Sequence, residues 1–136
     1  MVIYEEFDVS EMADVIGIYE EVGWSAYLQD VDKLFSAFEN SLYLLGAYDN
    51  DELIGFARVV GDGEHVVLVQ DLIVKTEYQN KGIGSCLFEK VMKKYQTVRM
   101  RMVVTDLEDK RNNTFYQKFG MKELKQYAMI GYVMEK

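Results

Sequence analysis

The residues best suited to chemistry lie at positions 71–85, where an apolar run ends in a polar turn and two glycines, Gly82 and Gly84. Apolar residues after Gly84 recur at helical spacing, so we expect the glycines to open a helix. Glycine has no Cβ and tolerates positive φ, so a ligand can approach its backbone closely. The first N–H groups of a helix lack internal partners and attract anions, and Lys81 adds a positive charge. The sequence therefore predicts a phosphate-binding loop, to which Ser85 adds a hydroxyl.

Asp71 is out of place in its surroundings, because it interrupts an apolar segment at 65–74. Val67, Val69 and Ile73 are expected on one face of this strand, with apolar residues on the other face as well. A strand that is apolar on both faces is typical of the centre of a sheet. A carboxylate there is costly unless it is paired or faces a wet cleft.

The remaining elements follow from apolar periodicity and turn residues. Helices are expected from Asp8 or Ser10 to Gly23, from Asp30 to near Asn40, from Gly84 to Tyr95, and over 111–119. Strands are expected over 2–7, 41–48, 53–60, 65–74, 97–105, 122–127 and 128–134. The helix after Gly84 joins two strands, so the strand at 97–105 is expected to pair parallel with the one that carries Asp71.

Composition limits the classes of function. The chain has 136 residues, of which 49% are hydrophobic and 28% charged, and we expect one soluble domain over 1–136. The net charge of −8 disfavours nucleic acid and suits a cationic substrate, although solubility alone explains it equally well. No apolar run suggests a membrane span or signal peptide, and the single Cys86 excludes an internal disulfide, so a cytoplasmic location is expected.

Metal-dependent and triad mechanisms lack the necessary residues. His65 and Cys86 are the only histidine and cysteine, so we expect no metal site and no Ser-His-Asp or Cys-His catalysis. Trp24 and Tyr27 lie in a loop-like segment after Gly23, where binding residues often occur. Trp24 is equally well explained as a core residue that fills a gap between two helices.

Two motifs together resemble those of the GNAT acetyltransferases. The first is Gln79-x-x-Gly82-x-Gly84, and the second, about thirty residues later, is Tyr116-x-Lys118-x-Gly120. The order of elements is also similar along essentially the whole chain. The resemblance implies an α/β fold of the GNAT (acyl-CoA N-acyltransferase) type, with a mixed central sheet of about six to seven strands flanked by about four helices.

The resemblance also implies roles for individual residues. Acetyl-CoA would be the co-substrate, with its pantetheine arm bound by the backbones of Ile73 and Val74. Tyr116 would protonate the departing thiolate as a general acid, or else it is a packing residue of its helix. The pyrophosphate would lie on the loop residues Gln79, Asn80, Lys81, Gly82, Ile83, Gly84 and Ser85. The family often has an asparagine where this chain has Asp109, so no asparagine contact is expected.

The acceptor is expected to be a primary amine, more readily a small molecule than a protein, framed by Trp24, Tyr27 and the closing strands at 122–134. Asp71 would accept its proton or hold the ammonium, with a purely structural carboxylate as the favoured alternative. The sequence therefore predicts an acetyl-CoA-dependent N-acetyltransferase that acts in a ternary complex, and a homodimer is possible. Alternatives are acetylation of a protein amine, a CoA-binding module without turnover, or a nucleotide-phosphate binder.

Overall fold

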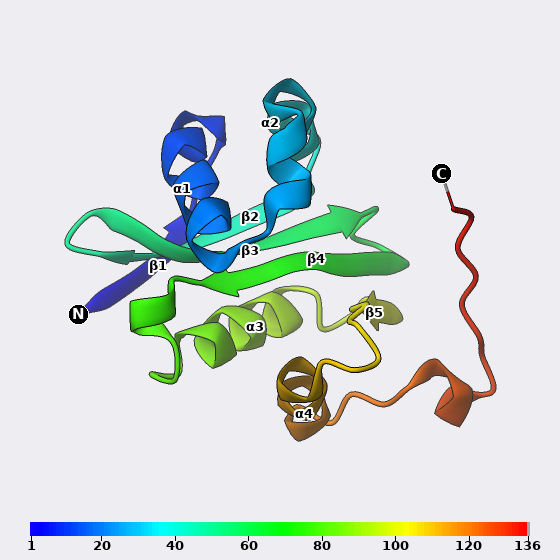
Figure 1. Cartoon of the computed structure of the whole chain (residues 1–136). Helices are drawn as coiled ribbons and strands as arrows, with labels where there is room; N and C mark the ends of the chain where they lie inside the picture. Colours follow the sequence, from blue (N-terminus) through cyan, green and yellow to red (C-terminus); the bar gives the residue numbers. More distant parts are fainter. Residues whose placement is uncertain (136) are drawn as a thin grey trace. The chain divides into compact units, whose positions relative to one another are not determined.

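The computed structural model describes residues 1–135, and their strands form one five-stranded sheet in the order β1-β2-β3-β4-β5 (Figure 1). Neighbouring strands are antiparallel from β1 to β4, and β4 and β5 are parallel. The parallel pair confirms the predicted strand-helix-strand unit. The strands are β1 (Val2–Glu6), β2 (Tyr43–Asp49), β3 (Glu52–Gly61), β4 (Val66–Val74) and β5 (Met100–Met102).

The chain divides into two compact units, Met1–Val103 and the residues from Val104 onward. Within the first unit, α1 and α2 cover one face of the sheet and α3 covers the other (Figure 1). The second unit contains α4 and a 3-10 helix, Leu124–Tyr127. The four α-helices of the described residues are α1 (Met12–Val22), α2 (Val31–Glu39), α3 (Ile83–Lys94) and α4 (Lys110–Lys118). None of the helices in residues 1–135 combines the length and apolar character that crossing a bilayer requires.

Local sequence signals explain where the helices begin and end. Gly23 caps the end of α1, and its φ of 80° lets its N–H bond back to the carbonyls of the last turn. Asp30 caps the start of α2, and its side chain accepts a hydrogen bond of 3.1 Å from the Lys33 N–H. Such a cap stabilises a helix by about 1 kcal/mol.

The core of the first unit lies between the sheet and helices α1 and α2. Tyr19, Phe38 and Phe56 are each at most 1% exposed and contact one another edge-on, with ring centroids 5.6–6.3 Å apart. Edge-to-face contacts of this kind add about 0.5–1.5 kcal/mol each to the gain from burial. The three rings fix α1 and α2 against β3, next to the strand that carries Asp71.

A β-bulge in β4 changes which of its residues share a face of the sheet. Val59 pairs with Val69, but the next residue, Arg58, pairs with Asp71, so Gln70 is an extra residue. Because Arg58 and Val59 point to opposite faces, Asp71 and Val69 do so as well. Ile73 accordingly packs with the α1–α2 core rather than sharing a face with Val69, which corrects the sequence prediction.

The two final strands predicted at 122–127 and 128–134 are not formed within the described residues, which is why the sheet has fewer strands than expected. Glu123 and Gln126 form a reciprocal capping box, and Leu124–Tyr127 is a 3-10 helix. The N–H groups of Ala128 and Met129 then bond back to Lys125 and Leu124. These local hydrogen bonds curl the segment and remove the donors that a strand would offer to a neighbour. Residues 128–135 have no regular secondary structure.

Candidate functional site

The glycine loop connects the end of β4 to the start of α3. Asn80 and Gly82 both have positive φ, of 63° and 82°, and Gly82 is the residue immediately before the helix. No side chain caps this helix, so its first N–H groups are not satisfied by a capping group. A Cβ built on Gly82 would have no atom within 4 Å, so the space beside this residue is open. The loop therefore has the geometry of an anion-binding site at a helix start.

Neighbouring side chains hold this loop in shape. The Gln79 amide donates a hydrogen bond of 3.0 Å to the Val74 carbonyl, which ties the loop to the end of β4. The Lys81 ammonium lies 5.5 Å from the centre of the Tyr78 ring, a cation–π contact. The Tyr78 hydroxyl donates to Asp49 over 2.8 Å, and this bond raises the pKa of Tyr78 to about 12. Lys81 thus has a positioned positive charge beside the open loop.

The second half of β4 has a backbone edge without a neighbouring strand. β4 pairs with β5 only over 66–68, so within the described sheet residues 69–74 bond on one side, to β3. The Lys75 N–H donates to the Ile54 carbonyl over 2.8 Å, which makes Val74 and Gly55 a non-hydrogen-bonded pair. The Val74 N–H and C=O therefore point to the open edge, whereas those of Ile73 point toward β3. By the same alternation, the N–H and C=O of Leu72 also point to the open edge, a feature that the sequence analysis missed.

Asp71 forms a buried ion pair with Arg58. The Arg58 Nε lies 2.6 Å from the Asp71 Oδ2, and the two side chains are 7% and 0% exposed. Burial disfavours the charged guanidinium, but the hydrogen bond and charge of Asp71 outweigh it and raise the pKa of Arg58. The guanidinium also lies 5.2 Å from the centre of the Phe38 ring. The carboxylate that is out of place in the sequence is thus paired, by a residue that the sequence analysis did not identify.

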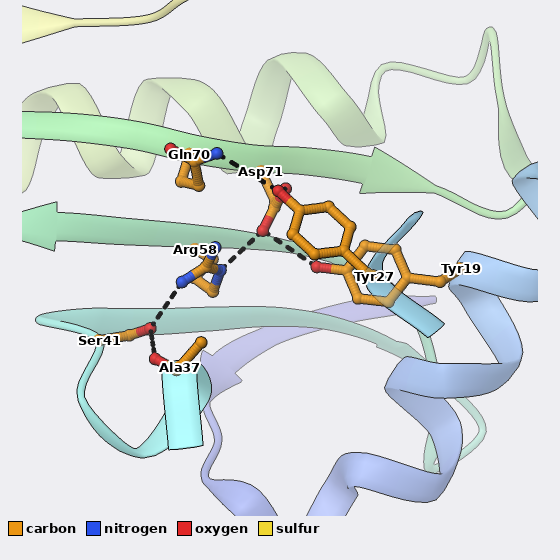
Figure 2. A network of polar contacts seen from close by, with 7 residues as sticks. All are labelled: Tyr19, Tyr27, Ala37, Ser41, Arg58, Gln70 and Asp71. Carbon is orange, nitrogen blue, oxygen red and sulfur yellow. Dashed lines mark hydrogen bonds and ion pairs between the residues drawn. The ribbon is translucent and has the colours of Figure 1, made fainter. Parts of the chain in front are cut away.

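Two tyrosines complete the hydrogen bonds of Asp71, as Figure 2 shows. The hydroxyls of Tyr19 and Tyr27 each donate to the carboxylate over 3.0 Å, to Oδ2 and Oδ1 respectively. Burial, reinforced by the Asp71 charge, raises the pKa of Tyr19 well above its ordinary value. The Tyr27 hydroxyl also accepts a hydrogen bond of 3.3 Å from the bulge residue Gln70. Tyr27 therefore links the buried pair to the partly exposed edge of the site.

Trp24 and Tyr27 lie together at this edge. Trp24 directly precedes a 3-10 helix, Ser25–Gln29, and its ring stacks on Tyr19 with centroids 6.0 Å apart. The Trp24 and Tyr27 rings are 6.3 Å apart. Trp24 is 37% exposed, so it does not simply fill the core between two helices. The structure thus brings the predicted residues Trp24, Tyr27 and Asp71 into one contiguous group, joined by Tyr19.

Tyr116 lies on α4, in the second unit. Asp109 caps this helix by accepting from the Asn112 N–H over 3.1 Å, and the Asn112 amide donates to the same carboxylate. Asn113 donates to the carbonyls of Asp106 and Leu107, so both asparagines hold the start of the helix. The Tyr116 ring is half-buried and contacts Phe115 edge-on, with centroids 5.2 Å apart.

Arg58 and Tyr19 are the site residues that sequence reasoning missed. Tyr19 fits the apolar stripe of its helix, so nothing in the pattern marks its hydroxyl. Arg58 had a usable signal, because it interrupts the apolar run Phe56-Ala57-Arg58-Val59-Val60 just as Asp71 interrupts the next strand. Two opposite charges in neighbouring buried strands predict an ion pair.

Comparison with known proteins identifies the family. Residues 9–121 match the model of the acetyltransferase (GNAT) family. A GNAT-family acetyltransferase from Streptococcus pneumoniae TIGR4 has a TM-score of 0.86 and 32% identity, covering 100% of this chain and 98% of its own. The fold is also shared with a PaiA N-acetyltransferase from Thermoplasma acidophilum in complex with coenzyme A, with a TM-score of 0.71, 22% identity and 90% coverage of both chains.

A sequence relative is longer than this chain. An uncharacterized ycf52-like N-acetyltransferase from Prochlorococcus marinus is 26% identical over 122 residues, which are 87% of this chain and 66% of that protein. The family match covers most of the chain and includes the glycine loop, Asp71 and Tyr116. The chain therefore belongs to the acetyltransferase (GNAT) family.

Proposed function

We propose that this chain is an acetyl-CoA-dependent N-acetyltransferase that acetylates a primary amine while both substrates are bound. One observation carries the proposal. The loop before α3 combines a left-handed Gly82 beside open space, an uncapped helix start and the Lys81 charge. This arrangement fits a pyrophosphate, and the related fold from Thermoplasma acidophilum was solved with coenzyme A.

The residues present fit the co-substrate along two segments. The pyrophosphate would be held by the backbone and side chains of residues 79–85, with Lys81 as the counter-charge. The pantetheine arm would bond to the open edge of β4, where the backbones of Val74 and Leu72 face outward. The Ile73 backbone bonds to β3, so we assign its part of the predicted role to these two neighbours. The thioester of the bound co-substrate supplies an activated acetyl group.

The chain's own residues then support transfer to the amine. The Val74 N–H would donate to the carbonyl oxygen as negative charge develops on it. Tyr116 would donate its phenolic proton to the departing sulfur, a role for which its motif is the support. Asp71 already accepts three hydrogen bonds, one of them from a guanidinium. We therefore assign Asp71 to positioning Tyr27, with direct proton acceptance as the alternative.

The proposed acceptor is a small cationic amine. Trp24 and Tyr27 present aromatic faces at a partly exposed edge, and such faces bind ammonium groups through their quadrupoles. The net charge of −8 would raise the local concentration of a cation and speed its encounter with the site. We place the reaction in the cytoplasm and assign it to residues 1–136 as one functional domain, since the family match spans both compact units.

Thermal unfolding with acetyl-CoA tests binding first. A ligand present at 100 times its dissociation constant stabilises the folded state by about 2.7 kcal/mol, which would raise the Tm of a domain of this size by about 5–10 °C. ATP and GTP serve as controls for a nucleotide-phosphate site. A Tm that does not change at millimolar acetyl-CoA would reject the proposed role of residues 79–85.

Thiol release from acetyl-CoA with a panel of amines then tests catalysis. Tyr116→Phe should lower kcat by about 100-fold or more, because general acid catalysis contributes about 10²–10⁴-fold. The dissociation constant of Tyr116→Phe for CoA should stay within about twofold of the wild-type value. Tyr127→Phe is the matched control, since Tyr127 is a 57% exposed tyrosine of the same unit. Undiminished turnover in Tyr116→Phe would exclude it as the acid, and binding without turnover on any amine would favour the CoA-binding module.

A further inference from the structure

The segment that leads from β4 into the glycine loop has several carboxylates around it. Asp49 ends β2, Glu52 begins β3, and Glu77 lies in the 3-10 helix Thr76–Tyr78 just before the loop. The hydrogen bond to Asp49 is the main cause that raises the pKa of Tyr78 to about 12, and the charges of Asp49, Glu52 and Glu77 add to it. An anion that approaches the loop therefore needs a cation that these carboxylates do not neutralise.

The two lysines of this segment are held in different ways. The Lys75 ammonium lies 3.1 Å from a Glu52 carboxylate oxygen, so its charge is compensated by an ion pair. Lys81 takes part in none of the ion pairs found in the part of the chain that the structure describes. Its ammonium lies instead 5.5 Å from the centre of the Tyr78 ring. The charge of Lys81 thus rests on a neutral group in an acidic neighbourhood.

Asp49 and Tyr78 together suit this purpose. The Tyr78 hydroxyl donates to the Asp49 carboxylate over 2.8 Å, which fixes the half-buried ring at the end of β2 and occupies that carboxylate. A phenol that donates to an anion gains electron density, and the negative face of its ring attracts a cation more strongly. The ring attracts Lys81 without neutralising its charge, and it limits the many rotamers of a free lysine.

We propose that Tyr78, anchored by Asp49, is a positioning residue for the acetyl donor, which holds the Lys81 ammonium beside Gly82 and out of ion pairs. The inference rests on the proposed function, because it assigns the phosphate groups of acetyl-CoA as the ligand of Lys81. A prepositioned cation binds an anion more tightly, since no ion pair must break and less side-chain freedom is lost on binding.

A double-mutant cycle on the Kd for acetyl-CoA, measured by titration calorimetry, tests this coupling. Lys81→Met should raise the Kd by about 10–100-fold, as expected for a charged contact. Tyr78→Leu should raise it by at least about threefold in the wild type, but by less than about 1.5-fold when Lys81 is already Met. The same factor in both backgrounds would show that Tyr78 acts only on the fold, and tighter binding by Tyr78→Leu would show that the ring competes with the ligand. Either result overturns the proposal.

Two further variants sharpen the comparison. Lys90→Met is the matched control for Lys81→Met, because Lys90 is also exposed and lies 5.4 Å from the centre of the Tyr4 ring, but it belongs to the second half of α3. It should leave the Kd within about twofold, since distant exposed charges are screened. Tyr78→Phe keeps the ring and loses only the hydroxyl, so it should weaken binding less than Tyr78→Leu. Equal effects of the two Tyr78 variants would overturn the role of the ring.

Steady-state kinetics separates positioning from chemistry. A residue that helps to bind the donor equally in the ground state and the transition state changes KM alone. Tyr78→Leu should therefore raise KM for acetyl-CoA and leave kcat within about twofold. A fall in kcat at unchanged KM would contradict the proposed role.

Nuclear magnetic resonance of the protein without ligand tests the position of Lys81 directly. Protons over the face of an aromatic ring resonate upfield, so the Cε protons of Lys81 should be shifted upfield in the wild type and return to ordinary values in Tyr78→Leu. Unshifted protons in the wild type would overturn the proposal, whether or not the chain binds acetyl-CoA. Shifted protons in a chain that does not bind acetyl-CoA would reject the proposed function instead, and with it the ligand assigned to Lys81.

Discussion

Replacing Asp71 by Asn should destabilise the protein far more than an ordinary substitution. The asparagine has nearly the same shape, and its amide oxygen can still accept from Arg58 and Tyr19. Its NH₂ can donate to the Tyr27 hydroxyl in place of accepting from it. The main change is therefore the lost charge, which leaves the guanidinium of Arg58, whose side chain is 7% exposed, without a counter-ion. Breaking a buried pair in this way costs about 3–5 kcal/mol, a large part of a typical total stability of about 5–15 kcal/mol.

Urea unfolding at neutral pH measures this loss directly, and the Tm should fall by about 10–20 °C. The control is Glu52→Gln, which breaks the exposed ion pair between Glu52 and Lys75 at 3.1 Å and should cost less than about 1 kcal/mol. The double variant Arg58→Met with Asp71→Asn removes both charges, so it should lose clearly less than the sum of the single variants. A loss below about 1 kcal/mol in Asp71→Asn, or strict additivity in the double variant, would refute the buried-pair argument.

The same variant separates the two roles of Asp71. A positioning carboxylate predicts that Asp71→Asn, assayed well below its Tm, raises KM for the amine more than it lowers kcat. A general base predicts a loss of about 10²–10⁴-fold in kcat. The pH profile adds a second readout, because loss of a general base removes the acidic limb of the kcat profile. Comparison with Tyr27→Phe, which keeps the charge pair, shows whether the effect acts through the Tyr27 hydroxyl.

Two further predictions concern turns. Three backbone N–H groups donate to Asp62 and lower its pKa from 3.8 to about 2, so between these pH values the unfolded chain binds more protons than the folded one. The free energy of unfolding should therefore fall as the pH drops through this window, and it should fall less steeply in Asp62→Asn than in the wild type. Urea unfolding at several pH values measures this. The same pH dependence in both proteins would contradict the lowered pKa of Asp62. Gly82→Ala should cost about 1 kcal/mol, because alanine is strained at a φ of 82°. Gly17→Ala, within α1 and equally free of neighbours, should instead stabilise the protein by about 0.5–1 kcal/mol. Urea unfolding that changes the free energy of unfolding in the same direction for both variants would refute the argument.

Much of the fold follows from local signals in the sequence. The caps at Asp30 and Gly23, the glycine loop and the apolar stripes place the four α-helices of residues 1–135, because each depends on residues within a few positions of one another. The parallel pairing of β4 and β5 follows from the helix that joins them, because a helical crossover returns the chain to the sheet in the same direction. The final strands were predicted wrongly, since β-type composition does not provide a neighbour, and the capping box at Glu123 favours a local turn.

The central charge pair is determined jointly by sequence and tertiary structure. The sequence by itself places Arg58 and Asp71 in two buried strands joined by a turn, and so requires each charge to find a partner. Counting back from the pair Gly61 and Val67 would set Gln70 opposite Arg58, but the bulge at Gln70 shifts the register by one residue. The shift brings Asp71 opposite Arg58 and onto the face covered by Tyr19. A one-residue shift depends on how the strands pack against both layers of helices, and only the tertiary structure sets that.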